Sequence, residues 1–263
     1  MNRYLITALS LAVATAAQSQ QQRNPDFRWD KAIGTGREIS LHNVAGHVTV
    51  KASTSDKVEI LGYKHGRGDL SRLHTEVRET ARGLVVCVVD DDTDWSCDER
   101  GMSTRSNRRG RDNWDRGSMD LEVLVPASTN LRANSVSGDV VVNGVQGEVH
   151  ANTVSGEVVL EHIRGPSVYG HSVSGDVSVQ VDALTGRGDL SFRTVSGDVR
   201  LDLPKVLDAD VSMSTVSGNM DSDYPITLNG RMSHRRIEAR IGEGGRRLDI
   251  STVSGNVRLR RAN

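Results

Sequence analysis

The most constraining feature of this sequence is a short word that recurs six times in its second half. Val-Ser-Gly always follows Ser or Thr and precedes Asp, Glu or Asn, and it begins at Val136, Val154, Val173, Val195, Val216 and Val253. Weaker half-copies lie between the words, so glycine recurs about every nine residues and the full word about every nineteen. Self-similarity at such a period is typical of a solenoid, whose units stack on their neighbours.

Within one unit, Val136, Val140 and Val142 share a parity, as expected of a strand with one buried face. The segment has no 3.6-residue spacing, which argues against a helix. In a parallel stack each residue lies beside its own counterpart, whereas an antiparallel meander gains nothing from words repeated in the same order. The sequence therefore predicts an all-β fold, a right-handed parallel β-helix or β-solenoid, with the hand taken from the general rule for parallel crossovers.

Two aliphatic ladders are expected to form the dry core of this solenoid. The first consists of the six valines of the repeated word, and the second of Val142, Leu160, Val179, Leu201 and Leu259. The glycines of the word are expected on the inward face, where the missing side chain lets the backbone bow or form a bulge. These glycines are Gly138, Gly156, Gly175, Gly197, Gly218 and Gly255.

The N-terminus has the pattern of a secretory signal. Arg3 precedes an apolar run from Leu5 to about Val13, and Ala14-Thr15-Ala16 fits a small-x-small cleavage site. The run is shorter than the ~20 residues that cross a bilayer, which disfavours a membrane anchor. We expect export to the periplasm or the cell surface and no transmembrane segment in the mature chain.

The remaining chain divides by regularity. We predict a signal peptide over 1–17, a linker over 18–35, a less regular N-terminal β-strand region over 36–126 and the solenoid repeats over 127–263. A charged segment at about 90–118 is expected to be a long loop, because it is crowded with Asp, Arg, Ser, Asn and Gly.

The two cysteines, Cys87 and Cys97, form an even pair in a chain that we expect to be exported. An oxidising compartment favours a disulfide between them. Their spacing differs from the Cys-x-x-Cys of redox-active pairs. We predict a structural disulfide that pins a loop onto a strand.

Composition excludes some functions. The chain has 33 basic and 34 acidic residues, whereas a dedicated nucleic-acid binder carries a clear positive excess. Aromatic residues make up only 3%, which argues against a carbohydrate-stacking groove.

Two acidic series are candidate calcium ligands. Asp90, Asp92, Asp94 and Asp98 resemble the opening of a calcium loop, but Trp95 occupies the place of the required glycine, so we favour a solvated acidic loop. One residue per coil forms the other series, which we expect to face solvent beside a turn. Its members are Asp139, Glu157, Asp176 and Asp198, with Asn219 and Asn256 closing it.

No catalytic motif is present in the sequence. It has no Gly-x-Ser-x-Gly elbow, phosphate loop or His-Glu-x-x-His, so we expect no catalytic residues and no cofactor. Two alternatives stay open. The first is a polysaccharide-active enzyme, because parallel β-helices include polysaccharide lyases and hydrolases. The second is a calcium-stabilised binding module.

Three passages carry a family resemblance. The Gly46–Val50 strand, the Leu121–Arg132 stretch and the Val-Ser-Gly ladders resemble the bacterial "putative adhesin" β-strand-repeat family of exported proteins of unknown function. The resemblance covers about residues 36 to 263. It implies a β-helical envelope protein without known catalytic residues, acting as an adhesin, scaffold or envelope-sensing module on an unknown envelope or surface component.

Overall fold

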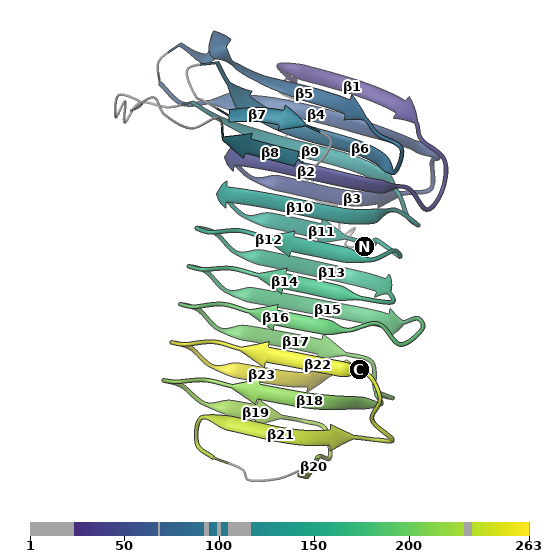
Figure 1. Cartoon of the computed structure of the whole chain (residues 1–263), viewed down its shortest axis with the longest axis vertical. Coiled ribbons are helices and arrows are strands. Elements are labelled where there is room, and N and C mark those ends of the chain that lie inside the picture. The colour runs from purple at the N-terminus through teal and green to yellow at the C-terminus, as the bar shows by residue number, and fades with distance from the viewer. Residues whose placement is uncertain are drawn as a thin grey trace, which may run out of the picture.

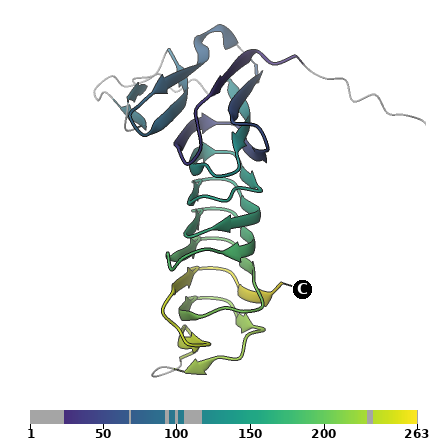
Figure 2. The same ribbon diagram turned by 90° about the vertical axis from the view of Figure 1, so that its right-hand side faces the viewer.

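The computed structural model describes residues 24–67, 69–91, 95–98, 101–104, 117–228 and 233–262. These residues form a rod of stacked coils in which two long sheets face each other across a narrow core (Figures 1 and 2). The helical content of the described residues is one short 3-10 helix, η1 (Leu70–Arg72). The all-β solenoid that the repeat predicts is confirmed, while its handedness stays a prediction.

The first sheet has ten strands. In spatial order they are β1 (Phe27–Ala32), β4 (Lys57–His65), β9 (Ser118–Pro126), β3 (Val48–Ser53), β11 (Val140–Asn143), β13 (Val158–Gly165), β15 (Val177–Leu184), β17 (Val199–Leu203), β23 (Val257–Arg261) and β19 (Met220–Ser222). All pairs from β9 to β19 are parallel. Strands β1 and β4 are antiparallel additions at one end.

The second sheet has eleven strands. Their spatial order is β20 (Thr227–Leu228), β21 (Arg236–Ile241), β18 (Ala209–Ser214), β22 (Arg247–Ser251), β16 (Leu190–Arg193), β14 (Val168–His171), β12 (Val149–Asn152), β10 (Asn130–Ser137), β2 (Glu38–Ala45), β6 (Gly83–Asp90) and β5 (Leu73–Glu79). The strands from β18 to β6 pair in parallel. In this sheet antiparallel strands lie at both ends, and they cover parallel edges that would otherwise template further pairing.

A small third sheet lies on the outer face of β6. It is the antiparallel hairpin of β7 (Trp95–Asp98) and β8 (Gly101–Thr104), and the Cys87–Cys97 disulfide ties it to β6. The predicted disulfide is confirmed. The hairpin belongs to an insertion in the chain between β6 and β9, where the regular coils have a short turn.

Equal positions of the repeat lie side by side, as the parallel stack predicts. Val140 pairs with Val158, which is next to Val177, and the serines of successive words form isolated parallel bridges. Each coil is therefore the template for the next.

The spatial order of the last two coils differs from their order in the chain. Ser254 bridges to both Ser196 and Ser217, so the coil of β22 and β23 lies between the coil of β16 and β17 and that of β18 and β19. A solenoid in which every coil stacks on the coil before it in the chain therefore does not describe this end. Arg246, immediately before β22, secures the inserted coil: its buried guanidinium donates to the carbonyls of Pro166, Gly186 and Gly188.

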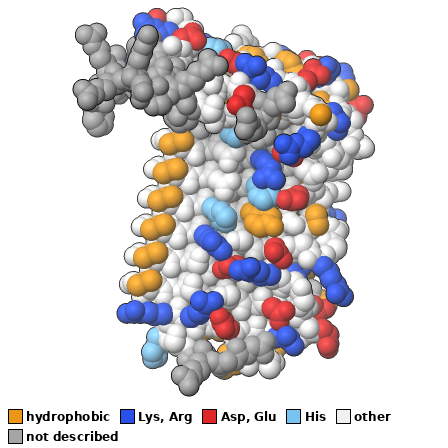
Figure 3. Space-filling view, in the orientation of Figure 1, with side chains coloured by type: hydrophobic (Ala, Val, Ile, Leu, Met, Phe, Trp, Pro, Cys, Tyr) orange, Lys and Arg blue, Asp and Glu red, His pale blue; other side chains and the backbone are white. Residues whose placement is uncertain are grey.

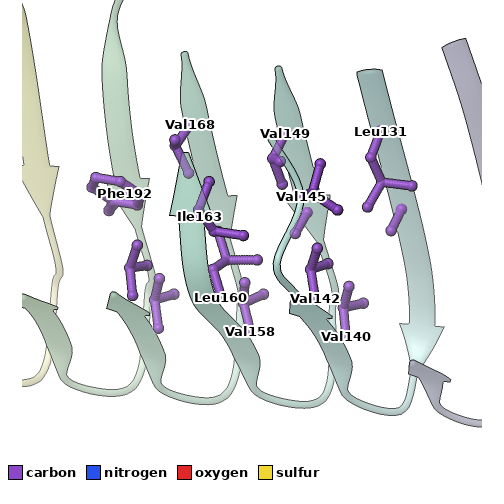
Figure 4. Packing of buried hydrophobic residues seen from close by; sticks show 14 of the residues in the cluster. Leu131, Val140, Val142, Val145, Val149, Val158, Leu160, Ile163, Val168 and Phe192 are labelled. Carbon is purple, nitrogen blue, oxygen red and sulfur yellow. The ribbon is translucent and has the colours of Figure 1, made fainter. Parts of the chain in front are cut away.

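The core contains the second predicted ladder but not the first. Val142, Leu160, Val179, Leu201 and Leu259 are buried, and Figure 4 shows such side chains from both sheets meeting between the layers. The valines of the repeated word are exposed by 43–58%, so their predicted burial is wrong. Each glycine of the word has a positive φ, +139° at Gly138, and lies in the turn rather than on an inward strand face. The turn shifts the alternation by one residue, which directs Val136 outward while Val140 and Val142 point inward.

The N-terminal region differs from the expected division in one respect. Strand β1 lies within the segment predicted to be a linker, and it pairs with β4 from Phe27 to Ala32, so that prediction is wrong for these residues. Strands β2 and β3 form a regular coil directly on β10 and β11. The predicted signal peptide lies outside the described residues.

Candidate functional site

The repeated word forms one edge of the rod, and the Ser or Thr that precedes it has a buried hydroxyl. Five of these six hydroxyls donate to the carbonyl of the word's glycine in a neighbouring coil, at 2.8–3.0 Å, and the sixth, Ser135, donates to the carbonyl of Gly46 at 3.3 Å. Thr194, for example, donates to Gly175 at 2.8 Å. These bonds satisfy hydroxyls that burial would otherwise leave unpaired.

The glycine of the word permits this close approach. A Cβ built on Gly197, whose φ is +151°, would lie 2.3 Å from the carbonyl oxygen of Gly175. The same contact would arise at the equivalent glycines, so the side chain is excluded both by space and by backbone conformation.

The acidic series is a hydrogen-bond ladder between coils. The Asp139 carboxylate accepts the backbone N–H of Glu157, Asp176 accepts that of Asp198, and Asp198 accepts that of Asn256, each at 2.8 Å. The Asn256 side chain continues the ladder to the backbone of Asn219. These residues lie at least partly exposed beside the turn, as expected, and the stack in addition uses the side-chain oxygens of Asp139, Asp176, Asp198 and Asn256.

Arg200 completes the middle of this ladder. Its guanidinium donates to Asp176 at 2.7 Å and to Asp198 at 2.8 Å. Partial burial acts to raise the pKa of Asp176, but the N–H of Asp198 and the guanidinium of Arg200 outweigh it and hold that pKa below its usual range. Arg200 thus offsets the repulsion between the two carboxylates that stacking brings together.

The valine of the word serves the stack through its backbone, since the carbonyl of Val136 accepts the N–H of Ser155, but its apolar side chain makes no such bond. Val136, Val154, Val173, Val195, Val253 and Val216, in spatial order, form a continuous column that we call the valine stripe. It appears as the line of hydrophobic side chains along one edge of the rod in Figure 3. Each interior member is about half exposed, because its neighbours cover the rest. Contiguous exposed apolar side chains are candidates for an interaction surface, so the valine stripe is the candidate on this edge.

A shallow hollow continues the stripe toward the N-terminal end. Its lining includes His47, His65, Asp120, Ser137 and Ser155. His65 Nε2 lies 2.6 Å from Asp120 Oδ2, and the other oxygen of Asp120 accepts the backbone N–H of His47. The hollow adds imidazole and carboxylate groups at the N-terminal end of the edge that carries the valine stripe.

The predicted calcium residues do not form a described site. Asp92 and Asp94 lie outside the described residues, while Asp90 ends β6 and Asp98 ends β7. In the described part of the chain, no group of three or more His, Cys, Asp or Glu side chains is arranged to hold a metal ion.

Two polar features on the sheet faces escaped the sequence reasoning. His150 stacks on Tyr169 with ring centroids 4.2 Å apart. His162 has a φ of +54° at a bulge in β13, where its Nδ1 lies 3.2 Å from Asp182. Neither pair recurs in the repeat, so no periodic signal could reveal it.

Comparison with known proteins places this architecture in a family. The model of the family described as Toastrack DUF4097 matches residues 36–260. The chain belongs to this family. The match spans both the irregular N-terminal coils and the regular repeats of the Toastrack chain, and thus confirms the resemblance to the "putative adhesin" repeat proteins.

A solved structure has the same fold. A "putative cell adhesion protein" from Clostridium sporogenes superposes with a TM-score of 0.50 at 9% identity, over 90% of the Toastrack chain and 99% of its own. A "putative adhesin" from Bacteroides fragilis gives 0.39 at 11% identity, over 90% and 96%. No curated protein matches the chain. Within the described residues, no helix combines the length and apolarity needed to span a membrane.

Proposed function

We propose that this Toastrack chain is a non-enzymatic, exported module of the cell envelope that binds an envelope or surface component through the lateral edge of its rod. It acts as an adhesin, a scaffold or a sensor of the envelope, in the periplasm or at the cell surface. The edge in question is the valine stripe with the hollow at its end.

The observation that carries this proposal is the valine stripe. The buried hydroxyl, the glycine and the acidic residue of the word each serve the stack, so their repetition has a structural reason. The valine is half exposed in each interior coil, and a polar residue would satisfy the same turn without presenting an apolar column to water. Repetition of an exposed apolar residue at six levels fits a surface kept for binding.

Export has separate support. Cys87 and Cys97 form a disulfide, and such bonds persist in oxidising compartments outside the cytoplasm. The signal-like N-terminus agrees with this assignment. The hairpin that the disulfide holds against β6 adds to the surface available to a partner at the N-terminal end of the rod.

The test compares matched variants in co-sedimentation with isolated cell envelopes. Val154→Thr, Val173→Thr and Val195→Thr, combined, keep β-branching and size while making the stripe polar. The control combines Val141→Thr and Val159→Thr on the outer face of the first sheet, where both residues are partly exposed. We expect the stripe variant to lose at least about tenfold in affinity, or about 1.4 kcal/mol, and the control to bind as the wild type does.

Equal envelope binding by the wild type, the stripe variant and the control would show that the valine stripe does not take part in binding. Turnover of an envelope glycan by the purified chain would contradict the non-enzymatic assignment and favour the polysaccharide-active alternative. Melting temperatures measured with and without a chelator decide the calcium-stabilised alternative.

A further inference from the structure

The spacing of the valine stripe restricts what can cover it. One valine projects from each coil, and neighbouring parallel strands lie about 4.8 Å apart. A partner that contacts all six side chains at equivalent points needs the same repeat over the same length. A second copy of this chain has both.

We propose that the valine stripe is a homotypic interface, in which two rods pair side by side and parallel about a two-fold axis along the stripe. This deepens the proposed function, since it names a partner for the same edge. The pairing is isologous, so each valine lies opposite its counterpart in the other rod. All six levels match at once because both stacks share one period.

The columns that flank the stripe decide between parallel and antiparallel rods. One flank is the acidic ladder, from Asp139 to Asp198. The other flank carries residues that donate hydrogen bonds or positive charge at the same coil levels, namely Asn134, Asn152, His171 and Arg193.

A two-fold axis along the rod sets the acidic flank of each copy against the donor flank of the other. Asp176 then faces His171, and Asp198 faces Arg193. These contacts add to the partners within each chain, which are Arg200 for the two carboxylates and Asp249 for Arg193. Antiparallel rods would instead set acidic flank against acidic flank, Asp176 against Asp198, and would leave the donors His171 and Arg193 facing each other without an acceptor. Charge complementarity therefore favours the parallel arrangement.

The stripe is narrow, which limits the strength of the pair. A stable interface buries about 800 Å² from each partner, and one valine column with its flanks is smaller than a sheet face. We expect a dimer that forms and dissociates with protein concentration and that weakens at high ionic strength, since exposed flank charges are screened by salt.

Cysteine cross-linking of the full chain tests the arrangement. Val154→Cys and Val253→Cys are prepared as separate single variants, at positions exposed by 46% each. Parallel rods bring Val154 to Val154, so mild oxidation is expected to link the Val154→Cys variant to itself. Antiparallel rods in full register bring Val154 to Val253, so only the mixture of the two variants would link efficiently.

Sedimentation equilibrium provides the second readout. The combined threonine variant of Val154, Val173 and Val195 is expected to raise the dimer dissociation constant at least about tenfold, and the Val141 and Val159 control to leave it unchanged. A wild-type chain that stays monomeric up to about 1 mM, or cross-links found only in the mixture, overturns the proposal. Monomeric protein whose envelope binding still needs the stripe would leave the proposed function standing. A chain that dimerises through the stripe but does not bind the envelope would support the homotypic interface and contradict the proposed function.

Discussion

The regular coils and the N-terminal end of the rod solve the same stacking problem by different means. In the regular coils, one word supplies a buried hydroxyl, a glycine and a carboxylate or amide, and each is used between neighbouring coils. At the N-terminal end the coils are closed by antiparallel strands, and a disulfide holds a hairpin over β6. Repetition makes stability a sum of equivalent contacts. Where repetition stops, covalent and antiparallel links replace it.

The largest expected difference in stability is between substitutions in the buried ladder, which contains Leu201, and substitutions in the exposed valine stripe. Leu201→Ala removes a fully buried side chain from the middle of the core, so we expect a loss of about 3 kcal/mol in unfolding free energy. Val195→Thr, on the exposed column of the same coil, is expected to cost within about 0.5 kcal/mol. Urea denaturation measures both. Equal losses would contradict the outward orientation of the valines.

Glycine substitution tests the close approach of neighbouring coils. Gly197→Ala forces a Cβ to within 2.3 Å of a backbone carbonyl, and we expect a loss of roughly 3 kcal/mol. Gly34 also has a positive φ, but a Cβ added there would meet no atom within 4 Å, so Gly34→Ala is expected to cost about 1 kcal/mol. Thermal melts of the two variants test this, and a Gly197→Ala chain as stable as the wild type would refute the close approach of the coils.

The disulfide should matter only at the N-terminal end. Combined Cys87→Ser and Cys97→Ser removes a loop constraint of about 3 kcal/mol by the loop-closure estimate. We expect faster amide hydrogen exchange in β7, β8 and β6, with unchanged exchange in β12 to β17. Exchange that accelerated through the regular coils would show that the two regions are not separable.

The smallest expected effect is the pH dependence of the acidic ladder. The pKa of Asp176 is depressed in the folded chain, so its ionised form stabilises the fold above the ordinary value of 3.8 and this contribution is lost as pH falls through the folded pKa. Asp176→Asn should therefore differ from the wild type at pH 6 and converge with it in acid. Asp202→Asn, which changes an exposed neighbour on β17, is the control and is expected to match the stability of the wild type at both pH values. If Asp202→Asn showed the pH-dependent difference and Asp176→Asn did not, the pH dependence would not come from the acidic ladder.

Much of this architecture could be predicted from the repeat, because identical words gain from parallel stacking alone. The buried ladder from Val142 to Leu259 followed from strand alternation. The outward direction of Val136 did not, since the positive φ of Gly138 shifts the alternation within the turn. The order of the last coils was also out of reach: identical words carry no label, and the deciding contacts of Arg246 are with the backbone carbonyls of distant loops.

The sequence likewise predicted part of the candidate site, namely which residues recur in it, but not their roles. It assigned the valines to the core and gave the acidic residues no part in the stack, because the role of each depends on a turn geometry that spacing alone does not specify. The His162 bulge and the His47 hollow involve single residues outside the repeat, which no periodic pattern indicates.

The coils stack in parallel and the last two exchange places, and paired cysteines in the serine column test this order. Ser254 lies between Ser196 and Ser217, and bridges to both. We expect the Ser196→Cys/Ser254→Cys chain to form an intramolecular disulfide on oxidation, detected by mass spectrometry of peptides, and the Ser196→Cys/Ser217→Cys chain to form none. A link only between residues 196 and 217 would mean that the coils stack in chain order, contrary to the structure.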